Sequence, residues 1–122
     1  MSLGILIVSH VADITVGVQK LISQTAAQVP VTVAGGTDDG GVGTSVDKIQ
    51  QAVAANKADE LLAFYDLGSA KMNLEMAQEF SDKPIHLYDV ALIEGAYTAA
   101  ALLQAGVERS EIKKQLRPLK IK

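Results

Sequence analysis

Cysteine is absent from this sequence of 122 residues, and aromatic residues make up only 4% of it. Without cysteine the chain has no disulfide bonds and no thiolate metal ligands. The scarcity of aromatic rings excludes the stacking platforms with which proteins bind single-stranded nucleic acid. The formal net charge of −3 also excludes the clustered basic surface that nucleic-acid binding requires. We therefore expect no nucleic-acid partner.

Long apolar runs are missing as well. No segment approaches the roughly 18 consecutive apolar residues of a membrane-spanning helix. The apolar N-terminal segment is too short for a signal peptide, lacks a basic leader and is interrupted by Asp13. We therefore expect a cytoplasmic protein with no membrane partner. An apolar fraction of 48% against 20% charged residues is typical of a globular protein, and the length predicts one domain over residues 1–122.

Strand and helix patterns alternate along the chain. The predicted strands are residues 3–9, 31–34, 60–65 and 85–88, and the predicted helices are residues 13–28, 44–58, 70–80, 91–105 and 111–115. Residues 116–122 are expected as a tail or a short edge strand. This order predicts the α/β class, with a four-stranded, mainly parallel sheet that carries helices on both faces.

Particular residue types mark the ends of these helices. Asp13, Thr44 and Ser110 are the expected N-caps, and Asp47 completes a capping-box-like signature behind Thr44. Gly106 is expected to end the long alanine-rich helix that precedes it.

The first predicted strand ends on His10. In an open α/β sheet, ligands and reacting groups collect at the carboxyl ends of the strands. A neutral imidazole there can act as a base, a metal ligand or a nucleophile, although a lone histidine in such a place is also often structural. The other histidine, His86, lies inside a strand pattern and is predicted to be structural.

Two further loops are predicted to open at the same edge of the sheet as His10. They are the glycine-rich residues 35–44 and the segment 66–69, and each leads into a helix N-terminus that suits an anion. Together they indicate phosphate chemistry on the histidine, with no metal and no cofactor bound to this chain. Asp66 is predicted to accept a hydrogen bond from one ring nitrogen, so that the other nitrogen attacks. The candidates for binding the phosphoryl oxygens are Thr37, Gly40, Gly41, Thr44, Gly68 and Ser69.

Other motifs have simpler interpretations. The glycine-rich loop also fits a flexible turn; it is not a P-loop, because no Gly-Lys-Ser/Thr follows, and it lacks the third glycine of a dinucleotide fingerprint. Asp38 and Asp39 are interpreted as a solvated turn rather than a metal site. Met72 and Met76, four residues apart, are predicted to pack into the core. The basic C-terminal side chains are expected to be solvated, and they are Lys113, Lys114, Arg117, Lys120 and Lys122.

Four segments, taken in order, resemble one known family. They are Ile7–His10, Ala34–Gly40 with Gly43–Ser45, Tyr65–Ala70, and Ile93–Ala96. The chain resembles the IIA domains of the mannose-type sugar phosphotransferase system, in particular the phosphotransferase subunits of bacterial dihydroxyacetone kinases. The resemblance covers nearly the whole chain and implies that His10 is the phosphorylated histidine. Its implied donor is the phosphocarrier protein, which is charged through enzyme I from phosphoenolpyruvate.

The resemblance implies two possible acceptors. In the dihydroxyacetone branch, the phosphoryl group passes to ADP on the nucleotide-binding subunit of the kinase, and the ATP so formed phosphorylates dihydroxyacetone on a third subunit. In the transport branch it passes to a IIB domain. The Asp-Leu-Gly-Ser-Ala that follows Tyr65 favours the first branch, because transport domains tend to carry a Gly-Gly-Ser-Pro type of ending. The family also implies a homodimer, for which the apolar C-terminal elements are a candidate interface.

Two alternatives from other classes are open. A flavodoxin-like module that binds a flavin or nucleotide would need a phosphate loop after the first strand, where Ser9–Asp13 does not supply one. A receiver-like domain phosphorylated on aspartate would need an acidic pair near the end of that strand, where Asp13 stands alone.

Overall fold

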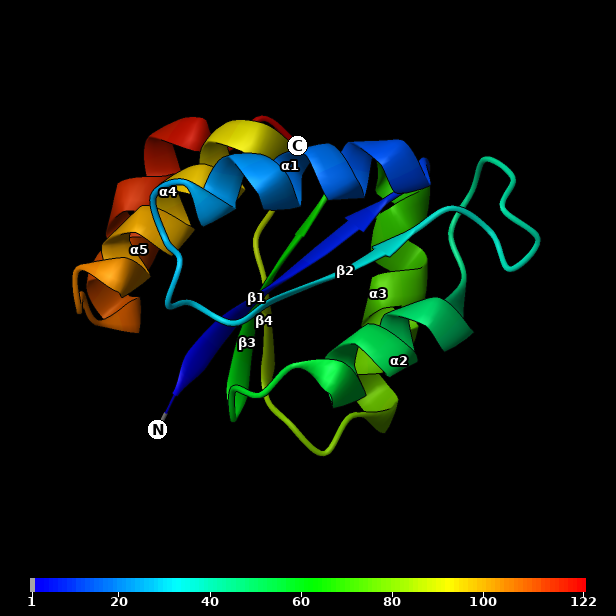
Figure 1. The fold of residues 1–122 in the computed structure, drawn as a ribbon, viewed down its shortest axis with the longest axis horizontal. Helices are drawn as coiled ribbons and strands as arrows, with labels where there is room; N and C mark the ends of the chain where they lie inside the picture. The colour runs from blue at the N-terminus through cyan, green and yellow to red at the C-terminus, as the bar shows by residue number, and fades with distance from the viewer. Residues whose placement is uncertain (1) are drawn as a thin grey trace.

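The computed structural model of the chain describes residues 2–122, which form a parallel sheet between two layers of helices (Figure 1). The strands are β1 (Leu3–Ser9), β2 (Val31–Gly35), β3 (Glu60–Tyr65) and β4 (Ile85–Leu87). The helices are α1 (Ala12–Ser23), α2 (Val46–Ala55), α3 (Gly68–Phe80), α4 (Leu92–Gln104) and α5 (Arg109–Leu116), and the 3₁₀ turn η1 (Arg117–Leu119) follows them.

Every strand pair is parallel, and the strand order is β2-β1-β3-β4. This confirms the predicted α/β class and its four strands. Val8 lies opposite Ala34 on one side and opposite Tyr65 on the other, so β1, β2 and β3 end at the same edge of the sheet. In Figure 1 the helices α1 and α3 begin at this edge, and the loop between β2 and α2 projects from it.

Side chains that alternate along the strands fill two hydrophobic layers. Ile5 and Ile7 of β1 face α1 and α4, whereas Leu6 and Val8 face α2 and α3. All four are fully buried, as expected for a parallel sheet with both faces covered. On the α4 side, the rings of Phe64 and Tyr88 stack with their centroids 5.7 Å apart.

The outer edge of β2 is capped by side chains. Ile5 of β1 donates its N–H to the carbonyl of Pro30, and Gly36 donates its N–H to the carbonyl of Ser9 in β1. Along β2, the backbone groups of even-numbered residues therefore bond to β1, and those of odd-numbered residues point outward. Of the outward carbonyls, that of Val31 accepts the side-chain amide of Gln19 at 3.1 Å, and that of Gly35 accepts the ammonium of Lys48 at 3.0 Å. Helices α1 and α2 thus satisfy two groups of an edge that would otherwise be open.

Three predicted N-caps are wrong, although their helices exist. Helix α1 follows Val11, and Asp13 lies in its first turn without making the cap. Helix α2 is capped by Ser45, whose hydroxyl accepts the N–H of Lys48 at 3.2 Å, because the neighbouring Thr44 is engaged elsewhere. Helix α5 follows Glu108, so Ser110 lies inside the helix.

The C-terminal ends of the helices also differ in part from the prediction. Helix α1 ends at Ser23 rather than at residue 28, because the chain turns to place Ala26 in the core. The predicted end of α4 is confirmed: Gly106 has a φ of +82° and donates its N–H to the carbonyl of Leu103.

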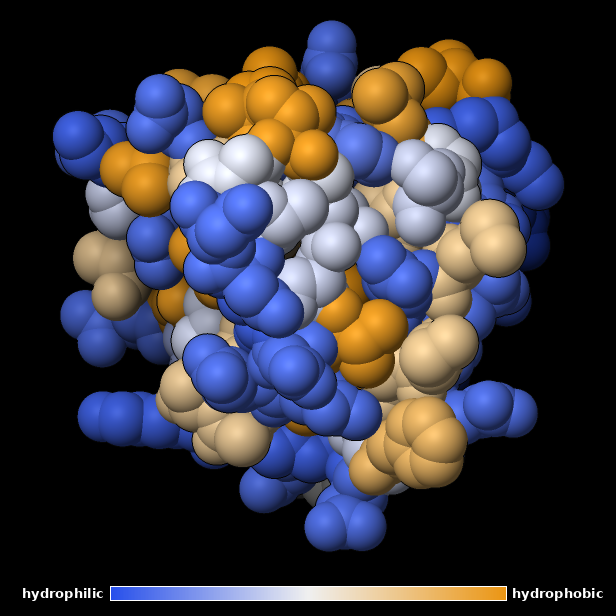
Figure 2. Space-filling model, turned by 90° about the vertical axis from the view of Figure 1, so that its right-hand side faces the viewer, coloured by the Kyte–Doolittle hydropathy of each residue, from blue (hydrophilic) through white to orange (hydrophobic). Residues whose placement is uncertain are grey.

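Helix α3 exposes the two methionines that were predicted to pack into the core. Met72 is 70% exposed, Met76 49% and Phe80 71%, so the predicted packing of the two methionines is wrong. The buried positions are Ala70, Leu74 and Ala77. Met72 and Met76 each lie two residues from Leu74, which is about 200° around a helix, so they face away from the side that Leu74 buries. Figure 2 views the side of the molecule that carries α3 and shows hydrophobic patches among its hydrophilic side chains.

The C-terminal segment packs against the molecule but forms no edge strand. Ile112 and Leu116 are buried in the core, so these apolar side chains are not available as an interface. Pro118 lies in η1 and has no N–H with which to continue a ladder. Lys120 makes one isolated antiparallel bridge, with Val90, which is all that remains of the predicted strand. No helix within residues 2–122 has the length and apolarity to cross a membrane.

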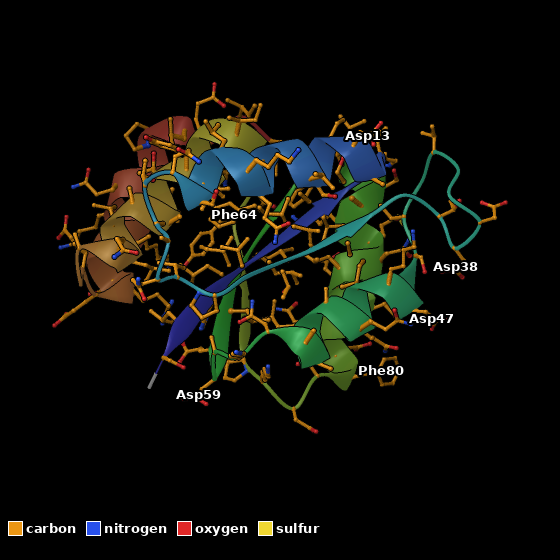
Figure 3. All side chains as sticks on the ribbon, viewed as in Figure 1. Asp13, Asp38, Asp47, Asp59, Phe64 and Phe80 are labelled. Atoms are coloured by element: carbon orange, nitrogen blue, oxygen red, sulfur yellow. The ribbon has the colours of Figure 1, made fainter. Side chains whose placement is uncertain are left out.

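The two phenylalanines provide a matched test of this packing. Phe64 is fully buried at the sheet, whereas Phe80 is 71% exposed at the end of α3 (Figure 3). We expect Phe64→Ala to lower the free energy of unfolding by about 3 to 5 kcal/mol and Phe80→Ala to change it by less than about 0.5 kcal/mol. Urea titration followed by circular dichroism measures both. Equal losses in the two variants would contradict the assignment of the core.

Candidate functional site

His10 lies directly after β1, at the edge where three strands end. Its imidazole is held on one side by Asp66, which follows β3: His10 Nδ1 lies 2.8 Å from Asp66 Oδ1. The two side chains are 17% and 16% exposed, so the pair is shielded but open to a partner on one side. The predicted contact between His10 and Asp66 is present in the structure.

Both carboxylate oxygens of Asp66 accept hydrogen bonds. The hydroxyl of Ser9 and the backbone N–H of His10 donate to Oδ2, at 2.8 and 2.9 Å. The backbone N–H of Leu67 donates to Oδ1 at 2.7 Å, beside the ring of His10. Burial disfavours the charged carboxyl, but the hydrogen bonds outweigh it and hold the pKa of Asp66 below its usual value. Asp66 is therefore an anion at neutral pH and a fixed acceptor for Nδ1–H.

The second ring nitrogen faces the start of α3. His10 Nε2 lies 2.5 Å from the hydroxyl of Ser69. Since Asp66 can only accept, Nδ1 carries the proton, and Nε2 keeps its lone pair and accepts from Ser69. Helix α3 begins at Gly68; the N–H of Ala70 donates to the carbonyl of Leu67, whereas those of Gly68 and Ser69 precede the first helical hydrogen bond and have no partner within the helix. A nucleophilic nitrogen is thus placed at a site suited to an anion.

The glycine-rich loop is joined to His10 through the backbone. Gly43 donates its N–H to the carbonyl of His10 at 2.8 Å, and Gly36 donates to the carbonyl of Ser9 at 3.1 Å. Gly43 and Gly36 have positive φ angles, +140° and +76°, a backbone conformation that residues with side chains rarely adopt. The loop therefore lies at the same edge as the histidine, as the strand order requires.

Most of the predicted phosphate ligands in this loop are engaged with one another. The hydroxyl of Thr37 donates to Asp39, and the N–H groups of Gly40 and Gly41 donate to oxygens of Thr37. Thr44 accepts the side-chain amide of Asn73 at 2.6 Å. A phosphate role for these four residues stays a prediction: Thr37, Gly40 and Gly41 would first have to give up a donated hydrogen bond, whereas the Thr44 hydroxyl accepts from Asn73 and keeps its own proton to donate. Of the predicted set, Ser69 contacts the ring of His10, and Gly68 precedes it in the chain.

Two other candidates make contacts of a structural kind. His86 Nε2 lies 2.6 Å from Glu60, which begins β3 and therefore stands at the opposite edge of the sheet from His10. Asp38, at the outer loop in Figure 3, accepts the hydroxyl of Ser45 at 2.5 Å. No group of three or more potential metal ligands occurs within residues 2–122.

Several residues around the site were not predicted. Ser9 is fully buried and bonded to Asp66, and a polar residue at the end of an apolar strand was the signal for it. Lys122 was expected to be solvated, but its ammonium donates to the carbonyls of Tyr65 and Asp66, at 2.5 and 3.0 Å. Asp89 accepts the hydroxyl of Tyr65, a contact for which no local pattern exists.

A parallel α/β sheet that presents a histidine between a carboxylate and a helix N-terminus suits a IIA domain of the phosphotransferase system. The chain belongs to this family, described as the PTS system fructose IIA component, which matches residues 4–113.

Particular relatives narrow the comparison. The chain is 48% identical to the phosphotransferase subunit DhaM of the PTS-dependent dihydroxyacetone kinase of Lactococcus lactis, over 99% of this chain and 98% of that protein. It is 44% identical to the phosphoryl donor subunit DhaM of PEP-dependent dihydroxyacetone kinase 1 of Listeria innocua, over 98% and 96%. A crystal structure of a protein of unknown function superposes with a TM-score of 0.85 at 32% identity, covering 100% of this chain and 98% of that one.

Proposed function

We propose that this chain is the phosphoryl donor subunit of a PEP-dependent dihydroxyacetone kinase, and that it carries the phosphoryl group on Nε2 of His10. The observation that carries the proposal is the pair of contacts on the ring, with Asp66 on Nδ1 and Ser69 on Nε2. The full-length likeness to the DhaM subunits supports the choice of kinase. The names of the two relatives and the geometry of the ring favour a phosphoryl carrier over a base acting on a small molecule.

The geometry supports a simple transfer. The lone pair of Nε2 forms a bond to the phosphorus of the incoming group, and the bond from phosphorus to the donor breaks. The proton on Nδ1 stays in place, so the ring becomes a cation that Asp66 stabilises. Ser69 and the first N–H groups of α3 are placed to receive the phosphoryl oxygens. Positioning and electrostatics suffice here, because phosphoryl transfer has a loose transition state.

The second transfer reverses these steps. A terminal oxygen of the acceptor attacks phosphorus, the bond to Nε2 breaks, and the ring returns to its neutral form. We propose that the donor is the phosphocarrier protein and that the acceptor is ADP bound to the nucleotide-binding subunit of the kinase. A IIB domain of a sugar transporter is the second candidate acceptor; the names of the relatives favour ADP. The homodimer and the cytoplasmic location stay predictions.

A labelling and chase experiment tests both transfers. Incubation with labelled phosphoenolpyruvate, enzyme I and the phosphocarrier protein should give an acid-labile, base-stable label on this chain. The label should move to ADP when the ADP-loaded kinase subunit is added and should remain when a IIB domain is added instead. Omission of the phosphocarrier protein is the control and should leave the chain unlabelled. Transfer to the IIB domain but not to ADP would assign the chain to the transport branch.

A further inference from the structure

Both groups that contact the ring of His10 belong to one short segment. Asp66, on Nδ1, follows β3, and Ser69, on Nε2, is the second residue of α3. The geometry of the reacting nitrogen therefore depends on how residues 66–69 are held relative to the sheet. Leu67 and Gly68, between the two contacts, are exposed, so packing around them does little to fix the segment.

One carboxylate accepts hydrogen bonds from residues on both sides of this segment. Asp89, in the connection between β4 and α4, accepts the hydroxyl of Tyr65 at 2.5 Å and the ammonium of Lys71 at 3.1 Å. Tyr65 is the residue before Asp66, and Lys71 follows Ser69 by two positions. Asp89 thus connects the end of β3 and the first turn of α3, the two elements from which the ring contacts come.

The charge states of this cluster favour lasting hydrogen bonds between Asp89 and its two donors, Tyr65 and Lys71. Burial disfavours the charged form of Asp89, but the hydrogen bonds from Tyr65 and Lys71 outweigh it and lower its pKa below the usual value. Burial, together with the hydrogen bond to Asp89, raises the pKa of the Tyr65 hydroxyl, so it stays a donor. Lys122 adds a further hold, because its ammonium lies 4.2 Å from the centre of the Tyr65 ring and bonds to the carbonyls of Tyr65 and Asp66.

We propose that Asp89 is a positioning residue for phosphoryl transfer at His10. It acts through Tyr65 and Lys71 to hold residues 66–69 in the arrangement that places Asp66 on Nδ1 and Ser69 on Nε2. Asp89 itself has no contact with the ring. The inference rests on the proposed function, in which His10 accepts the phosphoryl group.

The test compares Asp89→Asn with Tyr65→Phe, which removes only the hydroxyl that donates to Asp89. We expect each variant to lower the maximal rate of His10 phosphorylation by the phosphocarrier protein about 5- to 20-fold, with the KM for that protein nearly unchanged. The double variant should lose less than the product of the two single effects, because the amide oxygen left by Asp89→Asn can serve only one of the two donors and both changes weaken the same set of contacts. A maximal rate unchanged in both single variants would overturn the proposal.

Glu60→Gln is the matched control for a loss of stability. Like Asp89, Glu60 is a carboxylate that bonds to a side chain of another element, here His86, but it lies at the opposite edge of the sheet. We expect this variant to lower the melting temperature and to leave the maximal rate of transfer unchanged. A loss of rate equal to that of Asp89→Asn would reduce Asp89 to a general structural role and overturn the proposal.

The ring of His10 gives a direct readout. In the wild type, ¹⁵N chemical shifts should show the tautomer protonated on Nδ1, and Asp89→Asn and Tyr65→Phe should populate the other tautomer. Wild-type ring signals in both variants would overturn the proposal. Failure of the proposed function is a separate outcome, since the wild-type chain would then acquire no label on His10 at all.

Discussion

Replacement of His10 with alanine should abolish labelling of this chain by phosphoenolpyruvate, enzyme I and the phosphocarrier protein. No other side chain within residues 2–122 combines a ring nitrogen, a charged acceptor on its far side and a helix N-terminus in front of it. Asp66 would keep its hydrogen bonds from Ser9, Leu67 and the backbone of residue 10. We therefore expect the free energy of unfolding to change by less than about 1 kcal/mol. Autoradiography and thermal melting measure the two effects.

His86→Ala is the control for the His10 variant. His86 has a carboxylate partner in Glu60, as His10 has in Asp66, but it stands within β4 and away from the edge where the helices begin. Labelling should therefore persist in His86→Ala at the wild-type rate. Label that survives the loss of His10, or that disappears with His86, would refute the assignment of the phosphorylated residue.

Asp66→Asn should have the second largest effect, a reduction of about 10²- to 10⁴-fold in the rate of phosphorylation, as expected when control of an imidazole tautomer is lost. The carboxylate accepts two donors on each oxygen, the ring and Leu67 on Oδ1 and Ser9 and the His10 backbone on Oδ2. An amide has only one acceptor oxygen, so its NH₂ group must face donors in either orientation. Stopped-flow or quench measurements of the transfer rate test this.

The same substitution should change how stability depends on pH. Because folding lowers the pKa of Asp66, its stabilising effect is present above the unfolded pKa of about 3.9 and is lost as the pH falls through the folded value. The difference in stability between the wild type and Asp66→Asn should therefore be largest near neutral pH and shrink below about pH 4. Asp38→Asn, which alters an exposed carboxyl in the outer loop, should show neither effect. A constant difference across this range would contradict the role of the charge.

The sheet and the position of the site were predictable from sequence because they follow from local pattern and strand order. A continuous apolar run identified β1, and alternation with helices required parallel strands that end at one edge. Once His10 and Asp66 each followed a strand, their proximity was a consequence of topology. The contact between Asp66 and Nδ1 could be predicted in kind, since a carboxylate beside an imidazole accepts its proton.

The errors have physical causes that a single sequence does not show. Neighbouring Thr44 and Ser45 are equally good caps, and the choice between them depends on Asn73 from another helix, which binds Thr44. Met72 and Met76 have the spacing of a buried face, but the sheet accommodates the smaller Ala70 and Ala77. Only the folded chain shows which of two helix faces meets the sheet.

The contacts around the site were the least predictable part. Tyr65 and Asp89 are joined across 24 positions of the chain, and Lys122 reaches the end of β3 across 57. Neither contact leaves a local signature, because each depends on how separate elements pack. The same limit applies to the glycine-rich loop, where composition predicted phosphate ligands but Thr37 and Gly41 bond within the loop.

The capped edge of β2 restricts how copies of this chain can associate. A strand from a second molecule would need the outward N–H and C=O groups of β2, yet Gln19 and Lys48 already occupy the carbonyls of Val31 and Gly35. Of the three outward carbonyls, only that of Val33 would remain for pairing. Extension of the sheet into a continuous intermolecular one is therefore disfavoured at this edge, and with it the route by which exposed strands seed aggregation. We therefore expect a dimer formed on this side to rest mainly on side-chain packing.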